Sequence, residues 1–344
     1  MTKMASLTPP PAPERRVTST DVAREAGVSQ SAVSRAFTPG AHISAATRAR
    51  VLSAASRLGY QPNAIARSLV TQRSGIVALI VGDLHNPFYP QALSRFAQAL
   101  EARGKRALLL THDASQDVQL ALDAARSYQI EAAIVFPTRL NAAPPTLGDV
   151  SKGGVPVLLF NRHLPGEGLL SVACDNFAGG RLAADVLLHT GARQLAFIGG
   201  DPETSTNRDR LAGFTQRLAE EGLEPLATPA RTFHYDWGVE ATLELHRAGQ
   251  LPDAIFGAND IIAIGVLDAL RQLGRSVPEE VSVIGFDDIQ EAARLAYRLT
   301  TIRQPLGRMI ADALSVLDDP QPGHGPRLHP GELIWRGTVR GEQP

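Results

Sequence analysis

The sequence predicts a small all-α helix-turn-helix domain followed by an α/β core of two doubly wound lobes with parallel sheets. Three observations predict this fold class. Residues 17–62 hold three short helical stretches, each preceded by a residue that can cap a helix. From residue 74 onward, buried-strand patterns alternate with amphipathic stretches, and this alternation starts again near residue 194. A chain of 344 residues is long enough for such a division.

Composition limits the cellular setting of the protein. Residues 1–16 contain four prolines and lack the apolar run of a signal peptide, so we expect a disordered tail. No apolar run approaches the ~18 residues needed to span a bilayer. Cys174 is the only cysteine, which excludes an internal disulfide and a cysteine-based metal site. We therefore expect a cytoplasmic protein without membrane contact, metal or cofactor.

Charge is distributed unevenly along the chain. Between Arg15 and Arg73, nine arginines accompany only Asp21 and Glu25, a net charge of +7, so the remainder carries −8 of the total of −1. A basic block on an acidic body indicates a module that binds a polyanion, carried by a core with another task. The alternative is a solvated basic helix surface.

The first two helices are short and closely joined. Ser19 or Thr20 is expected to cap a helix that ends at Gly27, where glycine allows a positive φ. Ser29 caps a second helix over 30–37. The few residues between them predict a helix-turn-helix unit.

A third helix completes this unit. Ser44 caps a helix over Ala45–Leu58, whose inner face carries small apolar residues. In such a unit, the start of the second helix faces the DNA major groove. Gln30 can bond adenine at two atoms and Arg35 can bond guanine at two atoms, while serine hydroxyls and free N–H groups can hold phosphates. An alanine-rich helical bundle without DNA contact is the alternative.

A connector of residues 63–73 follows the helix-turn-helix domain. Its segment Asn63–Leu69 predicts a helix that is too short to be stable alone in water, so it can fold when it meets a partner. Leu69 can wedge between base steps in a minor groove. The alternative, that Leu69 packs on the next domain, stays open.

The core, residues 74–340, shows two successive series of strands and helices. Expected strands are 75–81, 107–110, 132–136, 155–160, 194–200, 253–258 and 281–286. Expected helices include Gln91–Arg103, Val118–Tyr128, Phe177–His189, Ile261–Leu273 and Pro305–Leu317. Crossings near Ser171–Asp175 and Leu299–Gln304 give a first lobe of about 74–172 and 303–318, and a second of about 173–300 and 319–340.

Polar residues follow several strands of both lobes. Ligands of doubly wound sheets bind beyond the carboxyl ends of the strands, so two lobes predict a cleft between them. The candidates in these positions are Asp83, Asn86, Phe88, Asp113, Asn161, Arg162, Arg210, Asn259, Asp260 and Gln304. Paired donors and acceptors beside an aromatic ring match a compact ring with several hydroxyls.

Each candidate also has a structural interpretation. The Asp and Asn residues are alternatively helix caps. Phe88 can belong to the core, and Arg210 can pair with Asp209 or Asp201. Trp237 either faces the cleft or packs at the start of a helix.

The N-terminal segments "VTSTDVAREAGVSQSAVSRAF" and "ISAATRARVLSAASRLGYQPNAIARSL" resemble the DNA-binding module of the lactose-repressor (LacI/GalR) family of bacterial transcription regulators. The resemblance implies a homodimer on a palindromic operator of double-stranded DNA, in which Leu69 opens the central base step. It implies that Gln30, Ser31 and Arg35 read bases, with Ser29 and His42 at the DNA backbone. The full set of predicted DNA-binding residues is Thr18, Ser29, Gln30, Ser31, Ser34, Arg35, His42, Asn63 and Leu69.

The core resembles the same family more loosely, to about residue 340, in "HNPFY", "FNR", "NRDRLAGF", "FGANDIIAIG", "VIGFDD" and "LTTIRQP". This part of the family is shared with periplasmic sugar-binding proteins, and it implies a sugar or sugar derivative rather than a purine as the effector. By position, the resemblance implies that the ligand cleft is lined by Asn86, Phe88, Asn161, Arg162, Arg210, Asp260 and Gln304. Asp113 and Trp237 complete the set of predicted effector-binding residues. The chain ends without leucine heptads, which favours a dimer over a tetramer.

Two other function classes fit less well. The sequence holds no Walker A, GxGxxG, HExxH or GxSxG motif, so we do not expect an enzyme. A sugar-binding protein without a DNA role would share the core, but it would not need the basic N-terminal module. We expect an effector-controlled transcriptional regulator, most simply a repressor.

Overall fold

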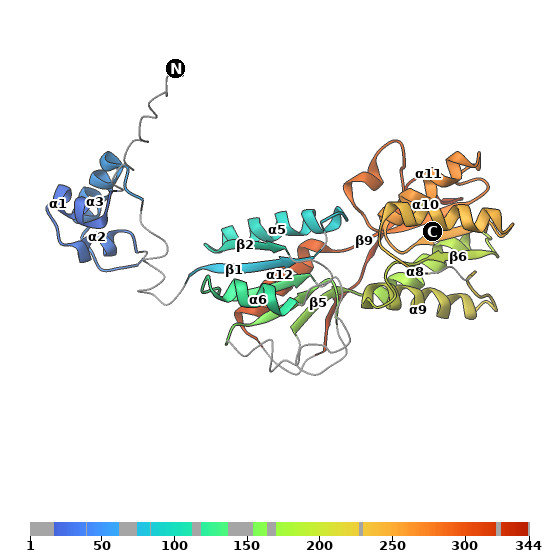
Figure 1. Cartoon of the computed structure of the whole chain (residues 1–344), viewed down its shortest axis with the longest axis horizontal. Helices are drawn as coiled ribbons and strands as arrows, with labels where there is room; N and C mark the ends of the chain where they lie inside the picture. Colours follow the sequence, from blue (N-terminus) through green and yellow to red (C-terminus); the bar gives the residue numbers. More distant parts are fainter. Residues whose placement is uncertain are drawn as a thin grey trace, which may run out of the picture. The chain divides into compact units, whose positions relative to one another are not determined.

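The computed structural model describes residues 17–38, 40–61, 74–82, 84–111, 118–136, 154–163, 170–226, 230–320 and 325–342. Its contacts divide the chain into two compact units, Met1–Ser74 and Gly75–Pro344 (Figure 1). Four predictions lie outside the described residues: the tail 1–16, the connector helix with Asn63 and Leu69, Asp83, and Asp113.

The first unit contains the three predicted helices, α1 (Ser19–Ala26), α2 (Gln30–Ala36) and α3 (Ala45–Leu58). Ser29 and Ser44 cap α2 and α3 as predicted, and Gly27 ends α1 with a φ of 63°. The prediction of Ser19 or Thr20 as the cap of α1 was wrong, because Thr18 forms a reciprocal capping box with Asp21. The interior is a small apolar cluster made by Val22, Ala23, Ala26, Val33, Ala36, Val51, Ala54 and Ala55.

The first lobe of the core is built on a sheet with strand order β10-β5-β4-β3-β1-β2, in which all pairs are parallel. Its strands are β1 (Ile76–Val81), β2 (Arg106–Thr111), β3 (Ala132–Phe136), β4 (Val157–Phe160), β5 (Leu170–Cys174) and β10 (Arg327–His329). Successive side chains of β1 enter different apolar clusters, because they point to opposite faces of the sheet. One cluster includes α5 (Phe88–Ala102) and α12 (Leu306–Asp318), and the other includes α6 (Val118–Arg126).

The second lobe has strand order β11-β9-β8-β7-β6, in which only β11 is antiparallel to its neighbour. Its strands are β6 (Leu195–Ile198), β7 (Ala254–Gly257), β8 (Ser282–Asp287), β9 (Thr300–Arg303) and β11 (Glu332–Ile334). Two helix pairs cover it: α8 (Asn176–His189) with α9 (Ser205–Ala219), and α10 (Tyr235–Arg247) with α11 (Asp260–Gln272). A short 3₁₀ turn, η1 (Gln290–Ala293), follows β8. Figure 1 shows the two helix pairs on opposite sides of this sheet.

The strands and helices that were predicted within the described residues are present, and their ends lie within three residues of the predicted ones. The lobe assignment of 319–340 differs from the structure. The strand β10 pairs with β5 of the first sheet, whereas β11 pairs with β9 of the second. The chain therefore crosses between the lobes after β5, after β9 and again between β10 and β11.

Glycines let α8 and α9 approach closely. A Cβ atom built on Gly213 of α9 would lie 2.0 Å from the carbonyl oxygen of Phe177, and one on Gly180 of α8 would lie 2.1 Å from that of Arg210. Backbone atoms cannot move away as a flexible side chain can. The close contact fixes the distance between α8 and α9, and therefore the position of Arg210 on α9.

We expect Gly213→Ala to lower the free energy of unfolding of the core by about 1–3 kcal/mol, because the methyl group forces the two helices apart. Gly307→Ala is the matched control. Gly307 lies in α12, is exposed, and a Cβ there would have no atom within 4 Å. It should leave stability unchanged or raise it by up to about 1 kcal/mol through helix propensity. Urea unfolding of both variants measures the difference, and equal stabilities would contradict the close packing.

Candidate functional site

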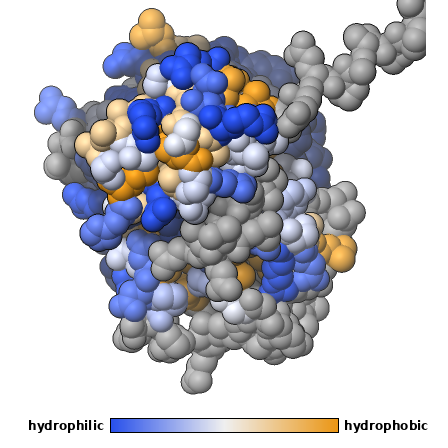
Figure 2. All heavy atoms as spheres, turned by 90° about the vertical axis from the view of Figure 1, so that its left-hand side faces the viewer, coloured by the Kyte–Doolittle hydropathy of each residue, from blue (hydrophilic) through white to orange (hydrophobic). Residues whose placement is uncertain are grey.

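The outer face of α2 is polar and exposed. Ser29, Gln30, Ser31, Ser34 and Arg35 are all exposed, whereas Val33 and Ala36 of the same helix are buried. On the face of the molecule in Figure 2, hydrophilic residues predominate and hydrophobic ones lie between them in small groups. The structure thus brings these predicted DNA-binding residues onto one solvent-facing surface, as a helix that enters a groove requires.

Hydrogen bonds order several side chains on this face. The Ser29 hydroxyl accepts from the Ala32 N–H at 3.3 Å and lies 2.9 Å from the Ser31 hydroxyl. The Arg35 Nε donates to the Ser31 carbonyl at 3.3 Å. The Gln30 Nε2 donates to the Ser19 hydroxyl of α1 at 2.9 Å.

Two further predicted DNA-binding residues flank this face. Thr18 is exposed, and its hydroxyl donates to the Asp21 carboxylate at 2.7 Å, so it also serves the cap of α1. His42 is exposed in the segment before α3. Arg48 of α3 donates to the carbonyls of Ala36 and Ala41, which ties this segment to the helices.

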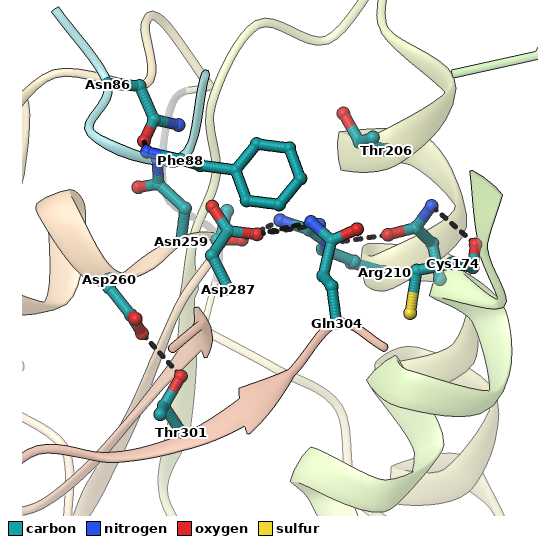
Figure 3. Close-up of polar contacts among 12 residues, drawn as sticks. Asn86, Phe88, Cys174, Thr206, Arg210, Asn259, Asp260, Asp287, Thr301 and Gln304 are labelled. Atoms are coloured by element: carbon teal, nitrogen blue, oxygen red, sulfur yellow. Dashed lines mark hydrogen bonds and ion pairs between the residues drawn. The ribbon is translucent and has the colours of Figure 1, made fainter. Parts of the chain in front are cut away.

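A polar cluster lies at the carboxyl ends of the strands in the core, and Arg210 of α9 is at its centre (Figure 3). Arg210 is 2% exposed. Its Nε donates to Asn176 Oδ1 at 2.9 Å, its Nη1 to the Ala258 carbonyl at 2.5 Å, and its Nη2 lies 3.4 Å from Asp287 Oδ1. The guanidinium carbon also lies 3.6 Å from the centre of the Phe286 ring. Arg210 pairs with Asp287 and not with Asp209 or Asp201, which the sequence had offered as partners.

Asp287, the last residue of β8, connects several parts of the core. Its Oδ1 accepts from Gln304 Nε2 at 2.7 Å, and it also accepts a hydrogen bond from Asn86 of the first lobe. Burial raises the pKa of the Asp287 carboxyl, while Arg210, Gln304 and Asn86 act in the opposite direction. Burial lowers the pKa of Arg210, against the attraction of Asp287. Asp287 was absent from the predicted site, although it follows a strand as the chosen residues do.

Asp260 lies beneath this cluster and is fully buried. Its Oδ2 accepts from the Ile289 N–H at 2.8 Å, and its Oδ1 shares a short hydrogen bond with the Thr301 hydroxyl. Burial, followed by the nearby Asp287, raises the pKa of Asp260 well above its ordinary value. Each oxygen has a partner within the protein, so Asp260 helps to position β9 and η1, and its predicted contact with a ligand stays a prediction.

Three buried amide atoms have no hydrogen-bond partner among the described residues: Asn161 Oδ1, Asn259 Nδ2 and Gln304 Oε1. Asn259 caps α11 through its Oδ1, which accepts from the Ile262 N–H at 3.0 Å, so the cap accounts for only one end of its side chain. Gln304 likewise uses only its Nε2, toward Asp287. Buried polar atoms are normally bonded, so these three indicate a place for a ligand or ordered water.

The remaining predicted residues surround or support this cluster. Asn86 accepts from the Phe88 N–H at 3.0 Å, and Phe88 is 1% exposed, with its ring directed toward the cluster in Figure 3. Arg162 is buried, and its guanidinium lies 5.9 Å from the centre of the Phe233 ring. Trp237 is 3% exposed and its Nε1 donates to the Gly199 carbonyl at 2.8 Å. These contacts hold Trp237 within the second lobe, and its predicted contact with the effector stays a prediction.

Asn176, which bonds Arg210, and Thr206, which Figure 3 shows at the start of α9, also belong to this region, and the sequence did not single them out. Asn176 opens α8 and bonds both Arg210 and the Cys174 carbonyl, which lies at the end of β5. Asn176 stands directly after β5 and Asp175, the residue that caps α8, and this position was the signal in the sequence that could have identified it. Among the residues that the structure describes, no group of three or more His, Cys, Asp or Glu side chains could hold a metal ion, and no helix is long and apolar enough to cross a membrane.

Comparison with known proteins bears on both sites. The family model for bacterial regulatory proteins of the lacI family matches residues 18–63, and the periplasmic binding protein-like domain matches residues 184–339. The transcriptional regulator CelR of Thermobifida fusca is 34% identical over 312 residues, which cover 87% of this chain and 91% of CelR. This chain belongs to the LacI family. The LacI-family ribose operon repressor of Bacillus subtilis is 30% identical over 299 residues, 86% of this chain and 89% of that repressor.

Solved structures of LacI-family regulators have the same fold. The lac repressor dimer bound to operator and the anti-inducer ONPF superimposes with a TM-score of 0.83 at 25% identity, covering 95% of this chain and 100% of that one. A CelR–cellobiose complex gives a TM-score of 0.68 at 30% identity, covering 94% and 100%. The predicted family and fold class are confirmed, and this LacI-family chain is a DNA-binding transcriptional regulator. The family is one of regulators and not of enzymes.

Proposed function

We propose that the protein is a repressor that binds a palindromic operator as a homodimer, and whose operator affinity is changed by a sugar or sugar derivative bound between the two lobes. The three buried amide atoms without partners carry the proposal for the effector. Asn161 follows β4 of the first lobe, Asn259 precedes α11 of the second, and Gln304 lies on a segment that connects them. We place one ligand against all three atoms, so that it contacts both lobes at once.

The chemistry of these atoms supports a sugar. Asn161 Oδ1 and Gln304 Oε1 are acceptors, and Asn259 Nδ2 is a donor. Hydroxyl groups both donate and accept, so adjacent hydroxyls of a sugar ring match all three, whereas a phosphate or carboxylate group only accepts when ionised. The Phe88 ring offers an apolar surface for the C–H face of the ring. The names of the relatives agree, since they include a ribose operon repressor and a cellobiose complex.

The contacts around Asp287 explain how a ligand would influence the rest of the molecule. Asp287 is bonded to Asn86 of the first lobe and to Gln304 of the connecting segment. A ligand that holds Gln304 and Asn161 favours one arrangement of the lobes, and it shifts the equilibrium only by its preference for that arrangement. Allosteric coupling of about 1–3 kcal/mol is usual for such a change. A regulator of this kind acts where the bacterial chromosome lies, in the cytoplasm.

A thermal-shift screen of the full chain tests the effector proposal. Simple sugars and their derivatives, sugar phosphates and nucleosides are added in turn, and a compound that binds the native state raises the melting temperature. We expect the largest increase from an uncharged sugar. An increase with nucleosides alone would contradict the proposed effector class.

The DNA proposal rests on α2. We expect Arg35→Ala to cost about 1–3 kcal/mol of binding free energy at one base-pair position and less elsewhere, because a guanidinium that bonds a guanine edge discriminates only there. Binding to a selected duplex and to its single-base-pair substitutions measures the profile. Arg24→Ala is the control, since Arg24 of α1 pairs with Asp21. A uniform loss across all substitutions would show that Arg35 contacts a phosphate.

A further inference from the structure

The side-chain amide of Gln30, the first residue of α2, is held by α1. Its Nε2 donates to the Ser19 hydroxyl at 2.9 Å, although the two residues are 11 positions apart. Gln30 is exposed, whereas Ser19 is partly buried. Buried Val22 of α1 and Val33 of α2 share one apolar cluster, so the helices that carry the two residues are held together independently of this bond.

The Ser19 hydroxyl can bond Gln30 because Thr18, and not Ser19, caps α1. The Thr18 hydroxyl accepts from the Asp21 N–H at 3.4 Å and donates to the Asp21 carboxylate. The Asp21 carboxylate also accepts from the Thr18 N–H at 3.0 Å. The start of α1 therefore does not depend on the Ser19 side chain.

The bond to Ser19 limits the positions that the Gln30 amide can take on the surface of α2. The terminal torsion of glutamine has a broad, roughly twofold preference, so an unrestrained amide presents its oxygen and nitrogen in either order. Here the nitrogen is directed to Ser19. One N–H group and the Oε1 atom remain for a base, and these are the two groups that bond N7 and N6 of adenine.

We infer that Ser19 is a positioning residue that sets the base selectivity of Gln30, and that this pair reads adenine. The inference rests on the proposed function, since it requires that α2 enters a major groove. Ser19 need not touch a base. It restricts the position of the side chain that does, and so reduces the binding of duplexes that would need the amide elsewhere in the groove.

The test uses the full chain and duplex DNA. A preferred duplex is selected from a pool of random sequences, and affinities are measured for it and for each of its single-base-pair substitutions. Gln30→Ala identifies the position that Gln30 reads. We expect Ser19→Ala to lower discrimination at that position alone by about threefold to tenfold, the size of one exposed hydrogen bond. Ser19→Thr keeps the hydroxyl and should retain the wild-type profile, and Thr20→Ala is the matched control on the exposed side of α1.

A double variant separates positioning from a general structural effect. In the Gln30→Ala background, Ser19→Ala should change nothing, because no amide remains to be oriented. A uniform loss at every position, an unchanged profile, or tighter binding of the preferred duplex by Ser19→Ala would each overturn the inference, the last by showing that the bond competes with DNA. A preferred base pair other than adenine–thymine at the Gln30 position would also overturn it. Failure of the proposed function is a different result, in which the wild-type chain selects no sequence.

Discussion

Replacing Arg210 with methionine is expected to lower the free energy of unfolding of the core by about 3–5 kcal/mol, the cost of removing one partner from a buried ion pair. The Asp287 carboxylate would remain buried at 6% exposure without its cation. Asn176 Oδ1 and the Ala258 carbonyl would also lose their donor. Methionine keeps much of the volume, so lost packing contributes little to this effect.

The loss should depend on pH. Without Arg210, the pKa of Asp287, already raised by burial, rises further. A carboxyl with a raised pKa in the folded state contributes its stability below its ordinary pKa, here 3.8, and loses it as the pH rises toward the folded-state pKa. The deficit of the variant relative to wild type should therefore be smallest near pH 4 and grow toward neutral pH.

Urea unfolding across this pH range measures the effect. Adding Asp287→Asn to Arg210→Met removes the unpaired charge and should recover part of the stability at neutral pH. Arg217→Met is the control, because Arg217 forms its ion pairs with Asp185 and Glu221 among exposed groups and should change stability little. A deficit that is constant with pH, or that Asp287→Asn deepens, would show that Arg210 acts through packing and not through charge.

Local signals predicted the elements that make the first unit. Ser29 and Ser44 are caps in the structure because each precedes a helical stretch with no competing residue beside it. At the start of α1, however, Thr18, Ser19 and Thr20 are all able to cap. Asp21 decides among them, because only Thr18 stands three residues before it and so completes the reciprocal box. The capping-box spacing from Thr18 to Asp21 is readable in the sequence.

The last two strands show where local signals end. β10 and β11 have three residues each, "RLH" and "ELI", which is too short for an alternating pattern. They are strands because β5 and β9 offer free edges to them. Which lobe each joins depends on how the chain crosses between the sheets, and no property of residues 319–340 encodes it.

The sequence predicted where the candidate site lies better than it predicted what each residue does there. Polar residues that follow parallel strands converge at one edge of a sheet, and this rule brought together Asn86, Arg210 and Gln304, which all contact Asp287. It could not separate the neighbours Asn259 and Asp260. In the structure, Asn259 bends back to cap α11 and leaves one amide atom unpaired, while Asp260 turns toward Thr301 and Ile289. That difference arises from the first turn of α11 and not from residue type.

Asn259 therefore offers the most selective test of effector binding. We expect Asn259→Ser to weaken binding of the sugar found in the thermal-shift screen by roughly 10- to 100-fold, because a ligand acceptor buried beside it loses its donor. Serine is as good a helix cap as asparagine, so its hydroxyl can still accept from the Ile262 N–H. The melting temperature without ligand and the affinity for operator DNA should both stay near the wild-type values.

Asn259→Ala separates the two ends of this side chain. Alanine removes the cap as well as the unpaired Nδ2. Asn259→Ala should therefore lower the free energy of unfolding by about 1 kcal/mol, which Asn259→Ser should not, and both variants should bind the sugar equally weakly. Isothermal titration with the sugar and unfolding without it measure the two effects independently. If the Asn259→Ser variant binds the sugar as tightly as the wild-type protein, Asn259 Nδ2 faces water and the effector contacts the lobes through other atoms. If Asn259→Ser lowers the free energy of unfolding as much as Asn259→Ala does, the role of Asn259 is structural.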